Sequence, residues 1–356
     1  MTEKNFFKIN IFGIILILVL TAVTVIIIDP YFHYHKPISF VSYKLSNQRY
    51  INDGIVKYFN YDAVITGTSM TENFKSSQFD KLFNVNSIKV PFSGGSYKEI
   101  NDNVEVALKN NKNIKYVLRG LDYGGINQEY NHMRYNSYPT YLYDNNIFND
   151  YKYWWNKEIL IKGVAINLIY TILRKKSTSF DEYSSWDNIE KGKEVILKTY
   201  KRAENENIEK LLLQEDIDRI DKNIEENVTK LPKQYPDVKF IYFITPYSIL
   251  YFDELNQKGE VMKQILAEKY MIEKILRIPN IELYSFFDNY NLIINLDNYI
   301  DSGHYINHIN DQILIWIKDK KYRLTKENYQ EYINNNLKFY KYYDYNKIFE
   351  KSVESL

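Results

Sequence analysis

The chain has 356 residues, 45% of them hydrophobic, which is enough for one large domain or two ordinary ones with a sizeable core. Its formal net charge is only +1, so no global basic field indicates a nucleic-acid-binding protein. The absence of cysteine excludes disulfides, thiolate metal sites and cysteine nucleophiles, and it is compatible with an exported bacterial protein.

The first predicted element is an uncharged, strongly apolar run from Ile9 to Ile28. A stretch of about 20 such residues has the length that crosses the hydrocarbon layer of a bilayer as one helix. A cleaved signal peptide usually has a shorter apolar core that ends in small residues, whereas this run ends in isoleucines before Asp29. We therefore expect an uncleaved, single-pass signal-anchor. Lys4 and Lys8 predict that residues 1–8 are cytoplasmic, so the rest of the chain would lie outside the cell membrane.

Residues 29–60 are expected to form a juxtamembrane linker. They are rich in tyrosine and phenylalanine, which fits an aromatic collar at the membrane surface. His33 and His35 alternate within this segment, and two histidines with that spacing can bind a metal from a strand. Because the sequence places no third ligand nearby, we interpret both as interfacial polar residues, and we predict neither a metal site nor a cofactor.

The first strand is predicted at Ala63–Ile65, followed by Gly67, Thr68 and Ser69 and then by a segment that can begin a helix. Ligands bind at the carboxyl edge of open α/β sheets, so Ser69 would lie at the lip of a crevice. Helix N-terminal amides beside it would favour negative charge. A serine directly after a strand is also an ordinary N-cap residue, and this pattern alone favours that structural role.

Two further strands continue the pattern, with one amphipathic helix between them. Val85–Val90 leads into Gly94 and Gly95, and Ile114–Leu121 leads into Asp122. Alternating strands and helices imply parallel strands joined by right-handed crossovers. The three strand ends should therefore meet along one edge of the sheet.

From about residue 127 to 235 the strand signal vanishes, and we expect a helical insertion or cap over the site. Charged residues interrupt its apolar run from Trp154 to Leu173, which argues against a second transmembrane span. The sheet resumes with a predicted strand at Val238–Thr245. Tyr247 and Ser248 at the end of this strand are candidate substrate-binding residues, with an ordinary turn as the equal alternative.

A helix at Glu254–Leu276, a strand at Ile281–Phe286 and a final core helix at Ile309–Lys318 complete the predicted domain. Before that helix, Asp301 precedes His304 by one tight turn. A hydroxyl is a poor nucleophile until a base accepts its proton, and a carboxylate fixes the tautomer of that base. The alternative is a structural Asx turn.

His308 has no matching ligand and is expected at the surface or behind the site. Residues 321–356 are expected to form a tail that is packed on the domain or bound to a partner.

The order of these blocks resembles that of the SGNH (GDSL-type) hydrolase superfamily: Gly67-Thr68-Ser69, Gly94-Gly95, a third strand end, and Asp301-Ser302-Gly303-His304. It is most similar to the membrane-anchored branch of DltD-like and AlgJ/AlgX-like polysaccharide acyl-transfer proteins. The resemblance covers Asp62 to Trp316. It implies a three-layer α/β/α, flavodoxin-like domain with a parallel sheet at residues 61–320, preceded by one transmembrane helix.

By this resemblance, Ser69 is the nucleophile, His304 is the general base and then acid, and Asp301 orients the histidine. Backbone amides of Ser69 and of Gly94 or Gly95 would form the oxyanion hole, because glycine lets the backbone approach the oxyanion closely.

Two blocks depart from the family pattern. Thr68 stands where the hydrolases often have aspartate, a change that the anchored branch tolerates. Gly120-Leu121-Asp122 stands in place of Gly-x-Asn-Asp, and an ionised aspartate cannot donate the hydrogen bond that an asparagine amide would donate. We therefore expect Arg119, or a reorganised hole around Asp122, to replace the third donor.

The resemblance implies an extracytoplasmic O-acyltransferase, with acetyl as the expected group, that modifies hydroxyls of a cell-surface or secreted polysaccharide through an acyl-serine intermediate. Outside the membrane there is no acetyl-CoA, so it also implies a multi-spanning membrane-bound O-acyltransferase as donor partner. The alternatives are a membrane-tethered carbohydrate esterase with the same residues, D-alanyl transfer to teichoic acid with Asp122 facing the amine, and a non-catalytic glycan-binding scaffold subunit.

Overall fold

The computed structural model describes residues 2–135, 138–144, 146–186, 189–206 and 208–350. Within them the chain forms one six-stranded sheet with the order β2-β1-β3-β4-β5-β6. Its strands are β1 (Ala63–Thr66), β2 (Ser87–Lys89), β3 (Tyr116–Leu121), β4 (Lys239–Ile244), β5 (Ile281–Ser285) and β6 (Arg323–Leu324). Strands β1 to β5 are parallel, and β6 pairs antiparallel with β5. The expected α/β class with a mostly parallel sheet is therefore confirmed.

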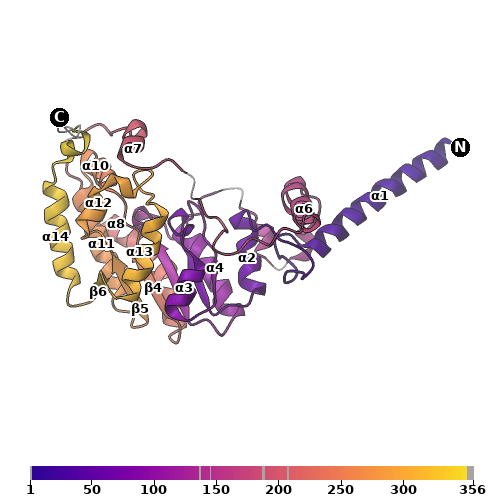
Figure 1. Cartoon of the computed structure of the whole chain (residues 1–356), viewed down its shortest axis with the longest axis horizontal. Coiled ribbons are helices and arrows are strands. Elements are labelled where there is room, and N and C mark those ends of the chain that lie inside the picture. The colour runs from indigo at the N-terminus through magenta and orange to yellow at the C-terminus, as the bar shows by residue number, and fades with distance from the viewer. Residues whose placement is uncertain (1, 136–137, 145, 187–188, 207, 351–356) are drawn as a thin grey trace.

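Helices surround the sheet and form most of its connections (Figure 1). They are α1 (Glu3–Ile28), α2 (Gln48–Tyr58), α3 (Ser76–Phe83), α4 (Tyr97–Asn110), α5 (Tyr151–Trp154), α6 (Ile166–Ile172), α7 (Lys193–Thr199), α8 (Gln214–Ile224), α9 (Lys230–Gln234), α10 (Ile249–Gln257), α11 (Val261–Ile275), α12 (Tyr290–Ile294), α13 (Asn307–Lys318) and α14 (Tyr329–Tyr342). Shorter turns include the 3₁₀ turns η1 (Ser69–Thr71) and η2 (Tyr123–Asn127) and the π-helical turns η5 (Ile159–Ala165) and η6 (Glu225–Thr229).

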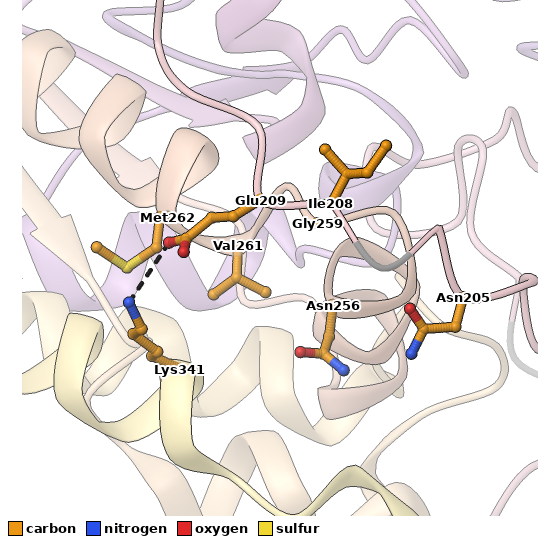
Figure 2. Close-up of a pocket in the computed structure, with 8 residues that line it drawn as sticks. All are labelled: Asn205, Ile208, Glu209, Asn256, Gly259, Val261, Met262 and Lys341. Atoms are coloured by element: carbon orange, nitrogen blue, oxygen red, sulfur yellow. Dashed lines mark hydrogen bonds and ion pairs between the residues drawn. The ribbon is translucent and has the colours of Figure 1, made fainter.

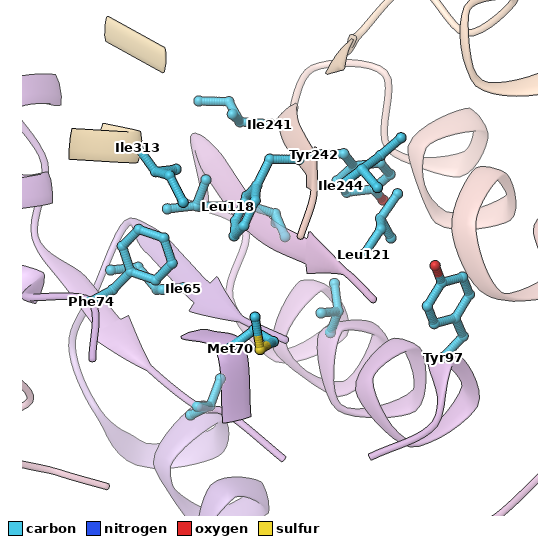
Figure 3. Packing of buried hydrophobic residues seen from close by; sticks show 14 of the residues in the cluster. Ile65, Met70, Phe74, Tyr97, Leu118, Leu121, Ile241, Tyr242, Ile244 and Ile313 are labelled. Atoms are coloured by element: carbon cyan, nitrogen blue, oxygen red, sulfur yellow. The ribbon is translucent and has the colours of Figure 1, made fainter. Parts of the chain in front are cut away.

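The helices pack in two groups, because right-handed crossovers place the β1–β2 connection on one face of the sheet and the β2–β3, β3–β4 and β4–β5 connections on the other. Helix α3 contacts α13, while α4 contacts η6 and α8 contacts α11. The central strands are continuous apolar runs, as expected for strands buried on both faces. Ile65, Leu118 and Ile241 occupy paired positions of three adjacent strands, and Figure 3 shows them on the side of Phe74 and Ile313.

Helix α1 projects from the body as one long helix (Figure 1). Among the described residues it is the helix that is long and apolar enough to cross a membrane. Of its side chains only Val25 and Ile28 are buried against the body, so the expected anchor at Ile9–Ile28 lies within a helix that is exposed along most of its length.

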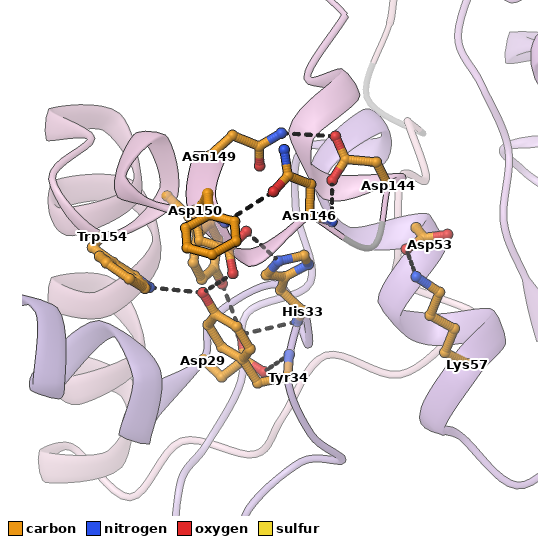
Figure 4. A network of polar contacts seen from close by, with 12 residues as sticks. Asp29, His33, Tyr34, Asp53, Lys57, Asp144, Asn146, Asn149, Asp150 and Trp154 are labelled. Atoms are coloured by element: carbon orange, nitrogen blue, oxygen red, sulfur yellow. Dashed lines mark hydrogen bonds and ion pairs between the residues drawn. The ribbon is translucent and has the colours of Figure 1, made fainter.

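A polar cluster fixes the chain where it leaves α1 (Figure 4). The Asp29 carboxylate accepts the main-chain amides of His33, Tyr34 and His35 at 2.7–3.0 Å, and the Tyr153 hydroxyl at 2.8 Å. His33 Nε2 lies 3.2 Å from a carboxylate oxygen of Asp150. These histidines, expected to be interfacial, are therefore held by the body itself.

The segment 29–60 differs from the expected linker. Its second half is helix α2, which packs against α4 and buries Ile51, Ile55 and Val56. A Cβ on Gly54 would lie only 2.3 Å from the carbonyl oxygen of Tyr31, so the helix approaches the chain after α1 very closely. The apolar face of α2 makes it part of the folded body.

The described part of the tail, residues 321–350, also belongs to the body, which was one of the two expected outcomes, and residues 351–356 lie outside the described residues. Strand β6 extends the sheet, and α14 packs along α11. The Tyr340 ring stacks on Phe252 with centroids 3.7 Å apart, and its hydroxyl donates to the Phe287 carbonyl at 2.6 Å.

The connection from β3 to β4 carries no strand in its described residues, consistent with the helical character expected for 127–235. Within these described residues the helices are short, and irregular stretches lie between them. The helix expected at Glu254–Leu276 is instead two helices, because Gly259 between α10 and α11 adopts a left-handed φ of 65°.

The burial of α2 predicts that Ile55→Ala lowers the free energy of unfolding by about 2–5 kcal/mol, because Ile55 is 0% exposed. Ile315→Ala is the matched control in an exposed helical position and should cost less than about 1 kcal/mol. Reversible denaturation of the full chain in detergent micelles measures both. Equal losses in the two variants would contradict the placement of α2 in the core.

Candidate active site

Ser69, His304 and Asp301 come together at the carboxyl edge of the sheet. Ser69 Oγ lies 2.7 Å from His304 Nε2, and His304 Nδ1 lies 2.8 Å from Asp301 Oδ2. Because Asp301 accepts the Nδ1 proton, Nε2 is the nitrogen free to accept the serine proton. The side chains of His304 and Asp301 are 34% and 49% exposed, so this edge is open to solvent. The arrangement is that of a nucleophile, a base and a carboxylate that orients the base.

The end of β1 positions Ser69. Gly67 has φ of 149°, and a Cβ there would lie 2.5 Å from Thr71 Cγ2, so only glycine fits this turn. Thr68 caps η1 by accepting the Met70 amide, and Ser69 is the first residue of that turn. The strand order reverses between β1 and β3, where open α/β sheets bind their ligands.

The loop that carries His304 is closed by a short antiparallel bridge between Tyr299 and Tyr305. Ser248 supports it from the start of α10: its hydroxyl and its amide both donate to the Ser302 carbonyl, at 2.8 and 3.0 Å. Tyr305 and Asn310 then bind the Met70 carbonyl, with 2.8 and 3.1 Å between donor and acceptor. The residue after the serine is thus tied directly to the residue after the histidine.

Asp301 serves the turn and the histidine at the same time. Its Oδ1 accepts the main-chain amides of Gly303 and His304 at 2.8 and 2.7 Å, while Oδ2 binds the ring. Burial opposes ionisation, but the His304 hydrogen bond and charge hold the pKa of Asp301 below its usual range. Burial likewise opposes the charged form of His304, yet Asp301 raises the pKa of the imidazole above its usual value. The Asx turn and the base–carboxylate pair are therefore one structure.

Two acidic residues lie close enough to affect the His304 charge. Burial raises the pKa of Glu72, whose carboxylate accepts the Trp186 indole N–H at 2.6 Å. Trp186 in turn stands edge-on to the His304 ring, with centroids 5.8 Å apart. Burial raises the pKa of Asp122 to about 6, and the Thr68 hydroxyl donates to this carboxyl at 2.7 Å.

The predicted oxyanion donors are placed differently. Ser69 begins η1, so its amide is one of those a helical turn leaves without an internal acceptor. The Gly95 amide donates to the Phe92 carbonyl at 2.7 Å, while Gly94 is exposed with a left-handed φ of 59°. The Arg119 guanidinium donates to the carbonyls of Asn227 and Tyr97 within the core, so Arg119 does not supply a donor to Ser69.

The two candidate substrate-binding residues also differ. Tyr247 is half-buried and lies near the Asp301–His304 turn, because a Cβ on Gly303 would come within 3.7 Å of its ring. Ser248 is 0% exposed, so it does not line a groove. Both of its donors bind Ser302, which makes it a support for the histidine loop. Ser248 is also the N-cap of α10 and accepts the Leu250 amide, which is the role that a serine before an apolar helix indicates in the sequence.

A cavity of about 290 Å³ is lined by residues outside the candidate site, among them Asn205, Glu209, Gly259 and Lys341 (Figure 2). The described residues contain no cluster of three or more side chains able to hold a metal, and His308 is exposed. Comparisons with models of protein families, with curated proteins and with solved structures gave no match. What the chain does is therefore inferred from the geometry at Ser69.

The pKa of His304 predicts the pH dependence of Ser69 reactivity. The imidazole must be neutral to accept a proton, so the first-turnover release of nitrophenol from p-nitrophenyl acetate should fall as pH drops through a pKa above 6.5. In Asp301→Asn this acidic limb of the pH–rate profile should move to lower pH. The plateau rate at higher pH should drop by about 10⁴-fold.

Asp311→Asn is the matched control. Asp311 lies on α13, where its carboxylate pairs with Lys75 and does not touch His304. It should leave both the limb and the plateau unchanged. A wild-type limb that does not move in Asp301→Asn would show that Asp301 does not set the basicity of His304.

Proposed function

We propose that this chain is a membrane-anchored acyltransferase of the SGNH type, which transfers an acyl group to hydroxyls of an extracellular polysaccharide. The acyl group that we propose is acetyl. The observation that carries the proposal is the continuous hydrogen-bonded path from Ser69 Oγ through His304 to Asp301. The order of the parallel strands, β2-β1-β3-β4-β5, is that of flavodoxin-like folds and supports the same family.

In the first half of the reaction, Ser69 Oγ attacks the acyl carbonyl carbon of a donor ester while His304 Nε2 accepts the hydroxyl proton. The carbonyl oxygen becomes an oxyanion beside the N-terminal amides of η1, where a preorganised donor is commonly worth about 3 kcal/mol. Collapse of this intermediate breaks the bond to the donor oxygen, which takes the proton from His304. The acyl group then remains on Ser69.

In the second half, a polysaccharide hydroxyl attacks the acyl-serine and gives its proton to His304 Nε2. Collapse returns that proton to Ser69 Oγ and releases the acylated sugar. Asp301 stays ionised throughout and stabilises the imidazolium, which agrees with its lowered pKa. Trp186, beside the His304 ring, offers an aromatic face on which a sugar can stack.

The anchor motivates the rest of the proposal. With α1 in the membrane and the body outside the cell, the acyl group must cross the bilayer before it reaches Ser69. We therefore include a multi-spanning membrane-bound O-acyltransferase as the donor partner. Asp122, near His304 and ionised above pH of about 6, would accommodate the amine of a D-alanyl group, which keeps that cargo as a variant of the same reaction.

Hydrolysis is the second candidate, because the side chains of His304 and Asp301 are 34% and 49% exposed and water has access to this edge. A carbohydrate esterase would form the same acyl-Ser69 and then release it to water. The two functions differ only in which nucleophile reaches the intermediate first.

A direct test mixes the full chain in micelles with p-nitrophenyl acetate, with and without oligosaccharides, and follows protein and sugar by mass spectrometry. We expect acetyl on Ser69 and then on sugar, with both products lost in Ser69→Ala. Ser185→Ala, at a neighbouring serine that bonds Asn73, is the control and should behave as wild type. Free acetate without acylated sugar would favour the esterase, and the absence of Ser69-dependent chemistry would favour a scaffold.

A further inference from the structure

The helical stretch formed by η5 and α6 carries a stripe of apolar side chains that the protein does not cover. Ile161, Leu168, Ile169, Ile172 and Leu173 are all exposed, up to 77% at Ile172. Their spacing of seven, eight, eleven and twelve residues from Ile161 places them on one face of the helical stretch η5–α6. We call these five residues the apolar stripe.

The opposite face of this stretch is bound to the body by polar contacts. Asn167 Oδ1 accepts the Lys44 amide and Thr171 Oγ1 accepts the Ser42 amide, both at 2.9 Å. Gly163 packs against the end of α1, because a Cβ there would lie 2.8 Å from Pro30 side-chain atoms. The orientation of the helix is therefore fixed, and the apolar stripe is turned outward.

The stretch also lies directly beside α1. Helix α5 and turn η5 both contact α1, and the Trp155 indole N–H donates to the Leu18 carbonyl at 3.0 Å. Leu18 is ten residues before Ile28, or about 15 Å along the helix axis. Figure 1 shows α6 next to the end of α1 that joins the body. Trp155 thus reaches back along the outer half of α1.

The second half of α1, from Leu18 to Ile28, requires an apolar environment beside Trp155 and the stripe. Leu20, Val23 and Ile27 are 56%, 44% and 52% exposed, so the body does not shield them. If α1 crosses a bilayer, lipid must extend along it nearly to Ile27. Trp155, in contact with Leu18, then stands at membrane depth, and the apolar stripe that follows lies at the boundary.

We propose that residues 155–173 form an amphipathic helical element that lies in the outer face of the bilayer crossed by α1, with the apolar stripe inserted among the lipid acyl chains. The sequence after the stripe fits such an element. The consecutive basic residues Arg174, Lys175 and Lys176 follow the stripe and are exposed, as is usual beside lipid headgroups.

This second contact has a consequence for the orientation of the body. A single helix lets a domain rotate about its anchor, whereas a helix and an attached stripe fix the domain against the membrane. The segment after the stripe leads on to Trp186, which stands beside His304. The membrane element and one wall of the candidate site are thus joined by a short length of chain. The proposal does not depend on the reaction at Ser69.

The test uses the absence of cysteine, which permits single labels in the full chain. Ile172→Cys, Ile14→Cys and Leu211→Cys are each labelled with an environment-sensitive fluorophore and reconstituted in vesicles of phosphatidylcholine with a minor share of phosphatidylglycerol. Ile14 lies within α1, so its label is the reference for a position inside the membrane. Leu211 is the matched control, an exposed apolar residue that follows Lys210, whose amide donates to the Gly259 carbonyl in the α10–α11 loop. Figure 1 shows α10 and α11 at the end of the body opposite α1.

Lipids with a nitroxide on the acyl chain should quench the labels at Ile172 and Ile14 several-fold more than the label at Leu211, even at one chain per vesicle. Quenching at Ile172 no greater than at Leu211 would overturn the proposal. An apolar environment of the Ile172 label that appears only at high protein-to-lipid ratios would also overturn it, because a second copy of the chain would then cover the stripe.

Discussion

The hydrogen bond between Ser69 Oγ and His304 Nε2 joins residues 235 positions apart, and the candidate site depends on it. Its 2.7 Å length requires that the turn after β1 and the loop before α13 be held in register. The Met70 carbonyl provides that constraint by accepting from both Tyr305 and Asn310. Ser248 fixes the far side of the loop through Ser302. A buried hydrogen-bond network of this kind specifies one geometry, because each donor left unpaired would cost about 1–3 kcal/mol.

The charges around His304 are arranged to support this bond. Asp301 lies at Nδ1, while Asp122 and Glu72 add negative potential, so the charged imidazole is favoured after it accepts a proton. Asp122 occupies the strand end where the proposed family carries an asparagine. Its carboxyl accepts from Thr68 and has a pKa of about 6, so near neutral pH it acts mainly as an acceptor. The end of β3 thus brings a carboxyl, and not a neutral amide donor, to the candidate site.

Much of the fold could be predicted from the sequence, because strands buried on both faces read as continuous apolar runs. All five parallel strands lie within two residues of their predicted ends. The pairing of Ser69 with His304 was expected from the resemblance to the SGNH family, and the two side chains lie 2.7 Å apart. Arg119 was assigned wrongly because its strand position points its side chain toward Tyr97 and Tyr242 in the core. Trp186 and Glu72 were not identified as neighbours of His304, since an irregular segment brings Trp186 there and no periodicity marks it.

The most direct measurement of the central claim is the site at which a fluorophosphonate attaches to the full chain, mapped by peptide mass spectrometry. Such reagents report a serine activated by a neighbouring base. The account predicts one adduct, on Ser69, and its loss in His304→Ala, a variant whose fold is checked by its unchanged unfolding transition. An adduct on another serine, or equally fast labelling of Ser69 without His304, would contradict it.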